Sequence, residues 1–322
     1  MKALSVFSGG LDSILAAEII RRQGIEVQAV FFETPFFTSS RAKATAGAAH
    51  LPLRIIDITD RHLGVVKDPP HGYGGNMNPC IDCHALMFRI AGEMMVKEGA
   101  GFIITGEVLG QRPMSQNRGA LSIIDRESGM EGLILRPLSA KHLPVTLPEE
   151  KGWVKRDEMM DFSGRSRKPQ FELAGRFNIT NYPSPAGGCL LTEEAFSRRL
   201  KDLMSFNPDF EVRDIELLKI GRHFRIGPGT KLVIGRKEDE NDIIGTSARE
   251  DDLLITTPSV PGPSALLMGE ITQLTEGLAA VLTVSYSDAK TGEALVKIMH
   301  RGKDRLTMAR GQEKIGFVKY MI

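Results

Sequence analysis

The residues with the clearest chemical potential lie near the N-terminus, where Ser8, Gly9, Gly10, Asp12 and Ser13 follow a short apolar run. Glycines lack a Cβ, so backbone N–H groups can approach an anion closely, and the start of a helix adds a positive partial charge. Asp12 can cap that helix or help to hold Mg²⁺. No Gly-Lys-Ser/Thr ending follows, so this is not a Walker A loop. The segment predicts a phosphate-binding loop between a strand and a helix.

Three cysteines form the second group of chemically competent residues. Cys80 and Cys83 are separated by about one helical turn at the expected start of a helix, so both sulfurs can face one point. A helix N-terminus also lowers a thiol pKa and favours the thiolate. Cys189 ends the run Pro-Ala-Gly-Gly-Cys at 185–189, which we expect to be a flexible loop that folds back over the site.

Three chemistries are compatible with these thiols. Zinc is one, with His84 as a fourth ligand, although structural zinc sites more often show four obvious protein ligands. A catalytic pair is another, in which one thiol carries a persulfide and the other resolves it as a disulfide. The favoured prediction is a [4Fe–4S] cluster on Cys80, Cys83 and Cys189 with an open position for exogenous sulfide, because Cys80 is superfluous in a two-cysteine scheme.

Alternating strand and helix patterns must position these groups. We expect strands at 2–7, 27–32, 53–57 and 102–105, and helices at 11–22, 38–50, 83–99 and 170–177. The β-α-β alternation predicts an α/β fold with a doubly wound parallel sheet, in which ligands bind at the carboxyl ends of the strands. Segments 8–13 and 106–116 both follow strands, so both are expected at that edge.

The bulk properties fit a soluble protein of two domains. The chain has 322 residues, 42% hydrophobic and 25% charged, with a net charge of +1. Any RNA-binding surface must therefore be a local patch. We expect domains at 1–205 and 206–322, the second a smaller α+β module. The odd number of cysteines, the absence of a signal-peptide pattern and the lack of a membrane-spanning run favour a cytoplasmic protein without membrane contact.

The site motifs resemble those of a known enzyme group. Residues 8–13 resemble the PP-loop of ATP pyrophosphatases, Ser-Gly-Gly-x-Asp-Ser, which split ATP into AMP and pyrophosphate and adenylate a carbonyl oxygen. Segment 105–116 resembles the Gly-Glu/Asp-x-Leu-Gly-Gln-x-x-Ser-Gln segment of 4-thiouridine synthetase, and segment 83–92 resembles its Cys-x-x-x-Met-x-x-Arg-Ile-Ala helix. Segment 78–83 resembles the Asn-Pro-x-x-x-Cys of bacterial tRNA 2-thiouridylases.

This resemblance covers roughly residues 1–195 and implies roles for individual residues. Cys83 is implied as a catalytic residue and Cys189 as the persulfide-forming cysteine. The residues implied to bind ATP are Ser8, Gly9, Gly10, Asp12 and Ser13, with Phe32 in the adenine slot. Those implied near the reacting centre are Gly106, Glu107, Gln111, Ser115 and Gln116. No THUMP-type or rhodanese domain is recognisable, so we expect tRNA and sulfur to be delivered differently than in the longer synthetases.

The second domain resembles the RNA-binding region of NFACT-type proteins. Segment 231–242 carries a Gly-Arg…Asn-Asp pattern similar to the Val-Gly-Arg-x-x-x-x-Asn-Asp of that family. The sequence departs from the family at Pro263, and the following histidine is absent. We interpret the basic tail as a phosphate-contacting surface; its cations are Lys297, His300, Arg301, Lys303, Arg305 and Arg310.

Together these features predict ATP-dependent thiolation of a tRNA uridine. ATP and Mg²⁺ bind at the PP-loop, the uracil carbonyl is adenylated, and sulfur arrives from a cysteine persulfide or from cluster-bound sulfide. A cysteine desulfurase or free sulfide would be the donor. The alternatives are an amide-forming PP-loop ligase, which needs no thiols, and a non-enzymatic RNA-binding adaptor. A 2-thio or 4-thio product, either tRNA position and any oligomeric state are compatible with the sequence.

Overall fold

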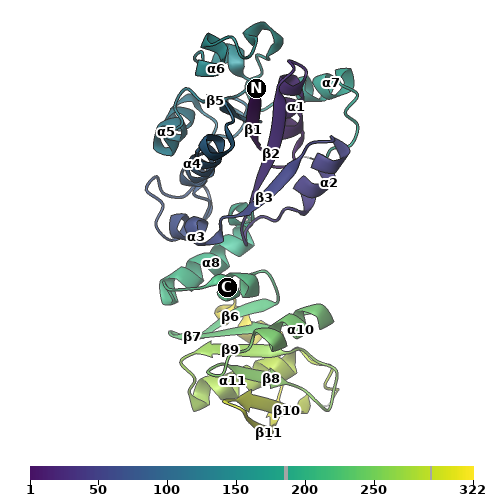
Figure 1. Cartoon of the computed structure of the whole chain (residues 1–322). Helices are drawn as coiled ribbons and strands as arrows, with labels where there is room; N and C mark the ends of the chain where they lie inside the picture. Colours follow the sequence, from purple (N-terminus) through teal and green to yellow (C-terminus); the bar gives the residue numbers. More distant parts are fainter. Residues whose placement is uncertain (185–187, 291) are drawn as a thin grey trace. The chain divides into compact units, whose positions relative to one another are not determined.

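The chain folds into two compact units, each built around its own sheet (Figure 1). The computed structural model describes residues 1–184, 188–290 and 292–322. The units comprise residues 1–192 and 193–322. In the described part of the chain, no helix combines the length and the apolar character needed to cross a membrane.

The N-terminal unit is a parallel sheet with helices on both faces (Figure 1). Its main elements are β1 (Lys2–Val6), α1 (Leu11–Arg21), β2 (Glu26–Glu33), α2 (Ser40–Ala48), β3 (Leu53–Asp57), α3 (Thr59–Lys67), α4 (Cys80–Glu98), β4 (Phe102–Thr105), α5 (Arg118–Ser128), β5 (Ile134–Leu135), α6 (Leu147–Glu150) and α7 (Lys168–Arg176). The strand order is β3-β2-β1-β4-β5, with parallel pairing throughout the described strands. The predicted doubly wound α/β fold is confirmed.

Alternate residues of β1 belong to two separate cores. Ala3 packs in the core that contains Ile14 of α1, whereas Leu4 packs in the core that contains Phe88 of α4. This alternation is the reason why the central strands read as nearly continuous apolar runs. The sheet is therefore covered on both faces and opens to ligands only at its strand ends.

Three helices that the structure describes in this unit, α3, α5 and the short α6, are absent from the sequence prediction. In α3 only His62 and Val66 are buried, so its apolar stripe is too short to recognise. The helix expected from residue 83 begins three residues earlier at Cys80, directly after Pro79.

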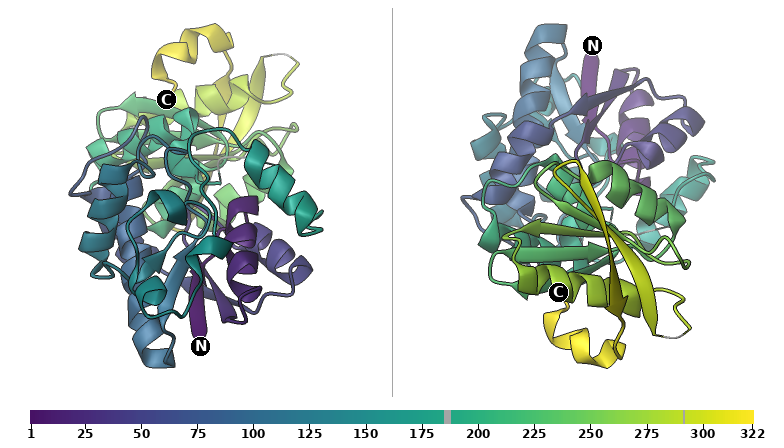
Figure 2. Two further views of the ribbon diagram at one scale, coloured as in Figure 1. Left: turned by 90° about the horizontal axis from the view of Figure 1, so that it is seen from above. Right: turned by 90° about the horizontal axis from the view of Figure 1, so that it is seen from below.

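The C-terminal unit is an antiparallel sheet with helices on both faces. Its main elements are α8 (Glu194–Phe206), α9 (Val212–Leu218), β6 (Arg222–Gly227), β7 (Thr230–Ile234), α10 (Glu238–Ser247), β8 (Leu253–Thr256), β9 (Ala265–Gly269), α11 (Gln273–Ser285), β10 (Glu293–His300) and β11 (Lys303–Arg310). The strand order is β11-β10-β8-β9-β7-β6, and Figure 2 shows the long yellow-green β10–β11 hairpin at one edge. The expected smaller α+β domain is confirmed.

The division between the units falls thirteen residues before the expected boundary at 205/206, since the second unit begins at Glu193. Helix α8, which the sequence analysis assigned to the first domain, is tied to the second. Asp202 pairs with Arg225 of β6 at 2.6 Å, and Arg199 Nη1 donates to the carbonyl of Leu218 at 2.8 Å.

Candidate functional site

The segment 8–13 joins β1 to α1, and its conformation requires glycine. Gly9 has a φ of +75°, and a Cβ there would lie 2.8 Å from the Cα of Ala42. Gly10 is the N-cap of α1 and brings no capping side chain, while Ser13 Oγ donates to the Gly10 carbonyl at 2.8 Å. The first backbone N–H groups of α1 therefore remain available to an anion.

A cavity of about 470 Å³ lies beside this segment, within the N-terminal unit. Val6, Phe32 and Thr105 line it from the carboxyl ends of three parallel strands. The predicted site residues that line it are Ser8, Gly10, Asp12, Ser13, Phe32, Cys80, Cys83, Gly106, Glu107, Gln111, Gln116 and Cys189. Gly9 and Ser115 are not among the lining residues: Gly9 shapes the loop from behind, and Ser115 is buried.

The second predicted loop packs directly on the first. A Cβ at Gly106 would lie 2.5 Å from the carbonyl carbon of Asp12 and from the backbone nitrogen of Ser13. The two backbones can approach this closely only because residue 106 is glycine. The contact places the residues that follow β4 beside the phosphate-binding segment.

Asp12 is held from two other parts of the unit. Its Oδ2 accepts a hydrogen bond from Gln111 Nε2 at 2.7 Å and lies 3.7 Å from Arg167. Gln111 is held in turn by Gln170 Nε2 at 2.9 Å. The other oxygen, Oδ1, is buried without a hydrogen-bond partner in the described part of the chain. A hard cation such as Mg²⁺ prefers such an oxygen ligand, so Asp12 fits the predicted Mg²⁺ role rather than a capping role.

All three cysteines line the cavity, and within the described residues they are thiols without a disulfide bond. Cys83 is buried, whereas Cys80 and Cys189 are partly exposed. Burial raises the pKa of the Cys83 thiol well above its usual value, and the neighbouring Cys189 and Cys80 raise it further. The expected lowering of the pKa by the helix N-terminus is thus wrong for Cys83, because desolvation has the larger effect. Of the expected loop at 185–189, residues 185–187 lie outside the described part of the chain.

His62 is a neighbour of Cys83 that the sequence analysis did not find. Its Nε2 lies 3.2 Å from Cys83 Sγ, and the rings of Phe36 and Phe37 pack beside it at 5.5 and 5.6 Å. Burial lowers the pKa of His62 to about 4, so the imidazole is neutral at neutral pH. No sequence signal links residues 62 and 83, because α3 and α4 bring them together only in the folded protein.

His84 begins a chain of polar contacts that leads away from the cavity. His84 Nδ1 lies 2.7 Å from Glu107 Oε1, and Arg136 Nε donates to Glu107 Oε2 at 2.9 Å. Arg136 also donates to both carboxylate oxygens of Asp125, at 2.9 and 2.7 Å. Glu107 and Arg136 are only 5% and 4% exposed. The sequence analysis named His84 only as a possible fourth ligand in the zinc alternative; in the structure its Nδ1 lies against a carboxylate.

Three arginine side chains contribute positive charge to the wall of the cavity. Arg41, Arg112 and Arg167 line it, and the sequence analysis gave none of the three a role. Across residues 1–184, 188–290 and 292–322, no three His, Cys, Asp or Glu side chains are grouped so that they could hold one metal ion. The arginines instead give the cavity positive charge suited to phosphate.

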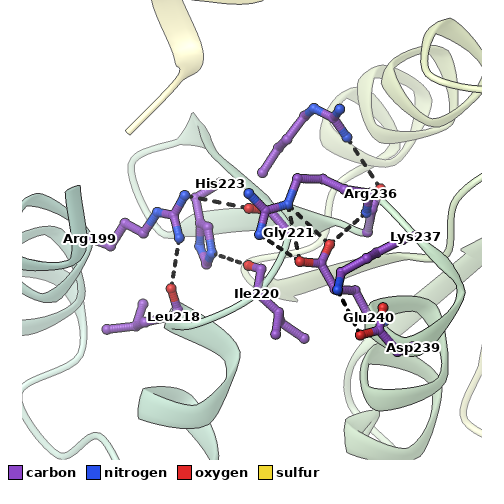
Figure 3. Close-up of polar contacts among 11 residues, drawn as sticks. Arg199, Leu218, Ile220, Gly221, His223, Arg236, Lys237, Asp239 and Glu240 are labelled. Carbon is purple, nitrogen blue, oxygen red and sulfur yellow. Dashed lines mark hydrogen bonds and ion pairs between the residues drawn. The ribbon is translucent and has the colours of Figure 1, made fainter. Parts of the chain in front are cut away.

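In the C-terminal unit, Arg236 of the Gly-Arg…Asn pattern contacts Glu240 on α10 (Figure 3). The Arg236 side chain pairs with Glu240 at 2.6 Å, and this bond lowers the pKa of Glu240 to about 2. Asn241 Oδ1 accepts the backbone N–H of Ser264 at 2.9 Å and so fixes the Gly-Pro-Ser turn. These pattern residues therefore stabilise the unit itself.

The cations of the basic tail are largely ion-paired. The pairs are Lys297 with Asp304, Arg301 with Asp251, Arg305 with Glu276 and Arg310 with Glu293. The tail is therefore a mixed-charge surface rather than a uniformly basic one, and a phosphate would have to compete with these carboxylates.

Two family models match the chain, one in each unit. Residues 1–142 match the model described as thiamine biosynthesis protein (ThiI). Residues 221–313 match the model described as NFACT protein RNA binding domain.

Curated relatives carry the name "Probable tRNA sulfurtransferase". The protein from Thermoanaerobacter sp. (strain X514) is 32% identical over 146 residues, which cover 42% of this chain and 36% of the relative. The protein from Geobacillus kaustophilus (strain HTA426) is also 32% identical over 146 residues, which cover 42% of this chain and 34% of the relative. The chain thus spans about a third of the length of these relatives.

A solved structure titled as a predicted subunit of tRNA methyltransferase from Methanocaldococcus jannaschii aligns over 42% of this chain and 69% of that chain. The identity is 17% and the TM-score is 0.33, too low to support a conclusion about this protein. The family models confirm the predicted resemblance: the N-terminal unit is similar to the ThiI family, and the C-terminal unit is similar to the NFACT RNA-binding domain.

Proposed function

We propose that the protein is an ATP-dependent tRNA sulfurtransferase that replaces a carbonyl oxygen of a uridine with sulfur. The observation that carries this proposal is a single cavity lined by the phosphate-binding segment 8–13 and by three cysteine thiols. The match to the ThiI family and the names of the curated relatives support it. One cavity then provides for both carbonyl activation and sulfur transfer.

In this proposal the phosphates of ATP bind at the start of α1. The hydroxyls of Ser8 and Ser13 and the first backbone N–H groups of the helix contact phosphate oxygens. Arg41, Arg112 and Arg167 balance the remaining negative charge from the cavity wall.

In this proposal different residues of the cavity contact the adenine ring and the cation. Phe32 lines the cavity at the end of β2 and supplies an apolar surface for adenine. The unpartnered Oδ1 of Asp12 would hold Mg²⁺, which neutralises phosphate charge when it is bound.

The first chemical step activates the uridine. Its carbonyl oxygen attacks the α-phosphorus, an O–P bond forms, and the bond to the bridging oxygen breaks and releases pyrophosphate. The protein contributes mainly position and charge stabilisation. The carbonyl oxygen, otherwise a poor leaving group, then departs as part of AMP.

The second step transfers sulfur. The terminal sulfur of a persulfide on Cys189 attacks the activated carbon, and AMP leaves. The Cys83 sulfur then attacks Sγ of Cys189 and forms a disulfide, while the transferred sulfur stays on the base. The proton of the Cys83 thiol is released to water as the disulfide forms, and the neutral His62 ring lies 3.2 Å from that sulfur. A dithiol reductant restores both cysteines.

Cys80 has no task in this exchange, although it lines the same cavity. Iron–sulfur clusters are bound by cysteine thiolates, so Cys80, Cys83 and Cys189 are residues of the right type and would hold a [4Fe–4S] cluster. Such a cluster would supply bound sulfide as the sulfur source. The donor outside the protein is a cysteine desulfurase or free sulfide.

The tRNA partner is supported by the C-terminal unit. Residues 221–313 are similar to an RNA-binding domain, and the mixed-charge tail offers cations from β10 and β11. Phosphate contacts of this kind weaken as the salt concentration rises.

The test is thiolation of tRNA by the full chain after anaerobic purification, with ATP, Mg²⁺, a dithiol and either sulfide or a cysteine desulfurase. We expect thiolated nucleoside and stoichiometric AMP. Cys83→Ala and Cys189→Ala should lose thiolation yet still release pyrophosphate in the presence of RNA. A triple Cys→Ser variant that retains full activity would contradict the proposal and favour an amide-forming ligase.

Iron and acid-labile sulfide assays on Cys80→Ala distinguish the two sulfur routes. Loss of iron together with thiolation supports the cluster. Thiolation that persists without iron supports the Cys83–Cys189 persulfide pair.

A further inference from the structure

A group of charged side chains in the C-terminal unit takes no part in the cavity described above. Helix α8 carries Arg199, Asp202 and Phe206 on one face, because residues three and four apart are neighbours on a helix. This face contacts the β6–β7 hairpin, where Arg225 and Lys231 are paired in register and so lie on the same side of the sheet. We call these five residues the α8 cluster.

One carboxylate, Asp202, is the ion-pair partner of the cluster's cations in the described part of the chain. Both of its oxygens are used by Arg225, whose Nε donates to Oδ1 at 3.0 Å and whose Nη2 donates to Oδ2 at 2.6 Å. Lys231 Nζ lies 3.4 Å from Oδ2, is buried, and makes no hydrogen bond to a described residue. The ammonium of Lys231 is therefore a second cation on a carboxylate that Arg225 already occupies.

Arg199 adds to this excess of positive charge. Its Nη1 donates to the carbonyl of Leu218 at 2.8 Å (Figure 3), and its buried Nε has no hydrogen-bond partner within residues 1–184, 188–290 and 292–322. Burial lowers the pKa of Lys231 to about 8, and Asp202 opposes this shift. The charges of Arg225 and Arg199 add to the shift. Partly buried positive charge without enough negative charge beside it is unfavourable, so a bound anion would stabilise the cluster.

The guanidinium of Arg225 is the part of the cluster that a ligand can reach. The side chains of Arg225 and Asp202 are 18% and 13% exposed. Because Arg225 uses Nε and Nη2 on Asp202, its Nη1 is left without a hydrogen bond to any described residue. Arginine binds phosphate oxygens through such N–H groups, and a lysine behind it adds charge without needing a fixed geometry.

An exposed aromatic ring lies beside this guanidinium. The central carbon of the Arg225 guanidinium is 4.0 Å from the centroid of the Phe206 ring, and Phe206 is 51% exposed. RNA bases stack on aromatic side chains and on arginine with little dependence on sequence. A free phosphate would use the guanidinium alone, whereas a nucleotide uses both the guanidinium and the ring. The juxtaposition of the two therefore favours a nucleotide.

We propose that the α8 cluster binds one nucleotide of an RNA chain, with the phosphate on Arg225 and Lys231 and the base stacked on Phe206. This inference rests on the proposed function, in which the C-terminal unit binds tRNA, and it names a place on that unit where RNA is held. Helix α8 precedes residues 221–313, so the match to the RNA-binding domain does not include it. The cluster also differs from the tail, where Lys297 has a carboxylate of its own.

The test is filter binding of an unmodified tRNA transcript to the full chain at several salt concentrations. Lys231→Met removes one charge and keeps a long side chain, so we expect about tenfold weaker binding and a salt slope that is less steep by about 1. Phe206→Ala should weaken binding about 5- to 100-fold with an unchanged salt slope, because stacking releases no counter-ions. Leu274→Ala and Lys290→Met, at exposed positions of the same unit, are the matched controls and should bind as wild type does.

Thermal unfolding without RNA distinguishes a ligand-binding lysine from a structural one. Lys231→Met should be at least as stable as wild type, because it removes surplus positive charge. A lower unfolding temperature together with unchanged tRNA binding would mean that Lys231 serves only to pair with Asp202, and it would overturn the phosphate assignment. Should Lys231→Met fail to fold, Phe206→Ala still tests the proposal, because Phe206 is exposed.

Inorganic phosphate tests the other source of the ligand. If it raises the unfolding temperature of wild type but not of Lys231→Met, while both variants bind tRNA normally, the cluster binds free phosphate and the RNA proposal is wrong. Normal tRNA binding by Phe206→Ala and Lys231→Met with no effect of phosphate also overturns it. A wild-type protein that does not bind tRNA contradicts the proposed function instead, so the two failures are distinguished.

Discussion

At the scale of single residues, the site depends on side chains held by partners from distant parts of the chain. Asp12 on α1 is fixed by Gln111, and Gln111 by Gln170 on α7. Gln170 is fully buried, so water cannot easily replace its hydrogen bond to Gln111. The other carboxylate oxygen of Asp12, Oδ1, is buried and has no hydrogen-bond partner among the described residues.

Replacing Asp12 tests this arrangement. Asp12→Ala removes the only carboxylate that offers an unpartnered buried oxygen among the described residues, so we expect RNA-dependent pyrophosphate release to fall at least about 100-fold. The release is measured with a coupled phosphate assay. Asp60→Ala, at an exposed position on α3, is the control. A near-normal rate for Asp12→Ala would remove Asp12 from the mechanism.

His62 makes the stability of the N-terminal unit depend on pH. Burial lowers its pKa to about 4, below the usual 6.5, so the folded state holds the ring neutral. As the pH falls below 6.5, His62 becomes protonated in the unfolded state. In the folded state His62 stays neutral down to about pH 4. The stability present at pH 7 should therefore decrease by about 2 kcal/mol at pH 5 from this residue alone.

Urea unfolding followed by fluorescence of Trp153, the single tryptophan, reports on this unit. Between pH 7 and pH 5, the free energy of unfolding of His62→Leu should fall by about 2 kcal/mol less than that of wild type. This difference does not depend on how much the substitution destabilises the protein at pH 7. His142→Leu serves as the exposed control. Equal losses in wild type and His62→Leu would contradict the interpretation.

At the scale of elements, the two loops that follow β1 and β4 form one structure. Their backbones touch because Gly106 brings no side chain against Asp12 and Ser13, and Gly9 adopts a left-handed conformation beside α2. A side chain at either glycine would force the segments apart.

Gly9→Ala tests the loop conformation with a close control in the same region. The new methyl group would meet Ala42 at 2.8 Å and the residue would keep a positive φ, so we expect a stability loss of about 1–3 kcal/mol and loss of ATP binding. Gly47→Ala on α2 has open space around its Cβ and should be neutral or slightly stabilising. Thermal unfolding and titration with an ATP analogue check both. Unchanged ATP binding by Gly9→Ala would be inconsistent with a phosphate-binding loop.

The sequence predicts those parts of the site that are continuous in the chain. The phosphate segment and the Cys80–Cys83 pair have local patterns, and their strand and helix positions follow from periodicity. The contacts of His62 with Cys83 and of Arg136 with Glu107 are long-range, and no periodicity reports them. Desolvation of Cys83 likewise depends on three-dimensional burial, so the helix position alone predicts the wrong direction for its pKa.

At the scale of the whole molecule, the cavity and the match to an RNA-binding domain lie in different units. The cavity is lined entirely by residues up to Thr192, and the match to an RNA-binding domain lies entirely beyond Glu193. We therefore expect catalysis and RNA binding to be separable by truncation.

A protein of residues 1–192 should bind an ATP analogue as the full chain does but bind tRNA at least about tenfold more weakly, because it lacks the cations of β10 and β11. Filter binding at several salt concentrations measures this, and the salt dependence should be shallower for the fragment. Residues 193–322 alone provide the complementary sample. Equal tRNA affinity for the fragment and the full chain would assign the C-terminal unit a different task.

The cavity also has a consequence for the order of synthesis. Its wall includes Val6 near the start of the chain and Thr192 at the end of the first unit, so it cannot close until residue 192 has left the ribosome. The described residues that line it all belong to the first unit. Since domains emerging from the ribosome fold as units, N-terminal first, the first unit and its cavity are complete while the second unit is still being made. A nascent chain that stalls once residue 192 has left the ribosome would already display a finished cavity, with its three thiols, before it has the module proposed to recruit tRNA.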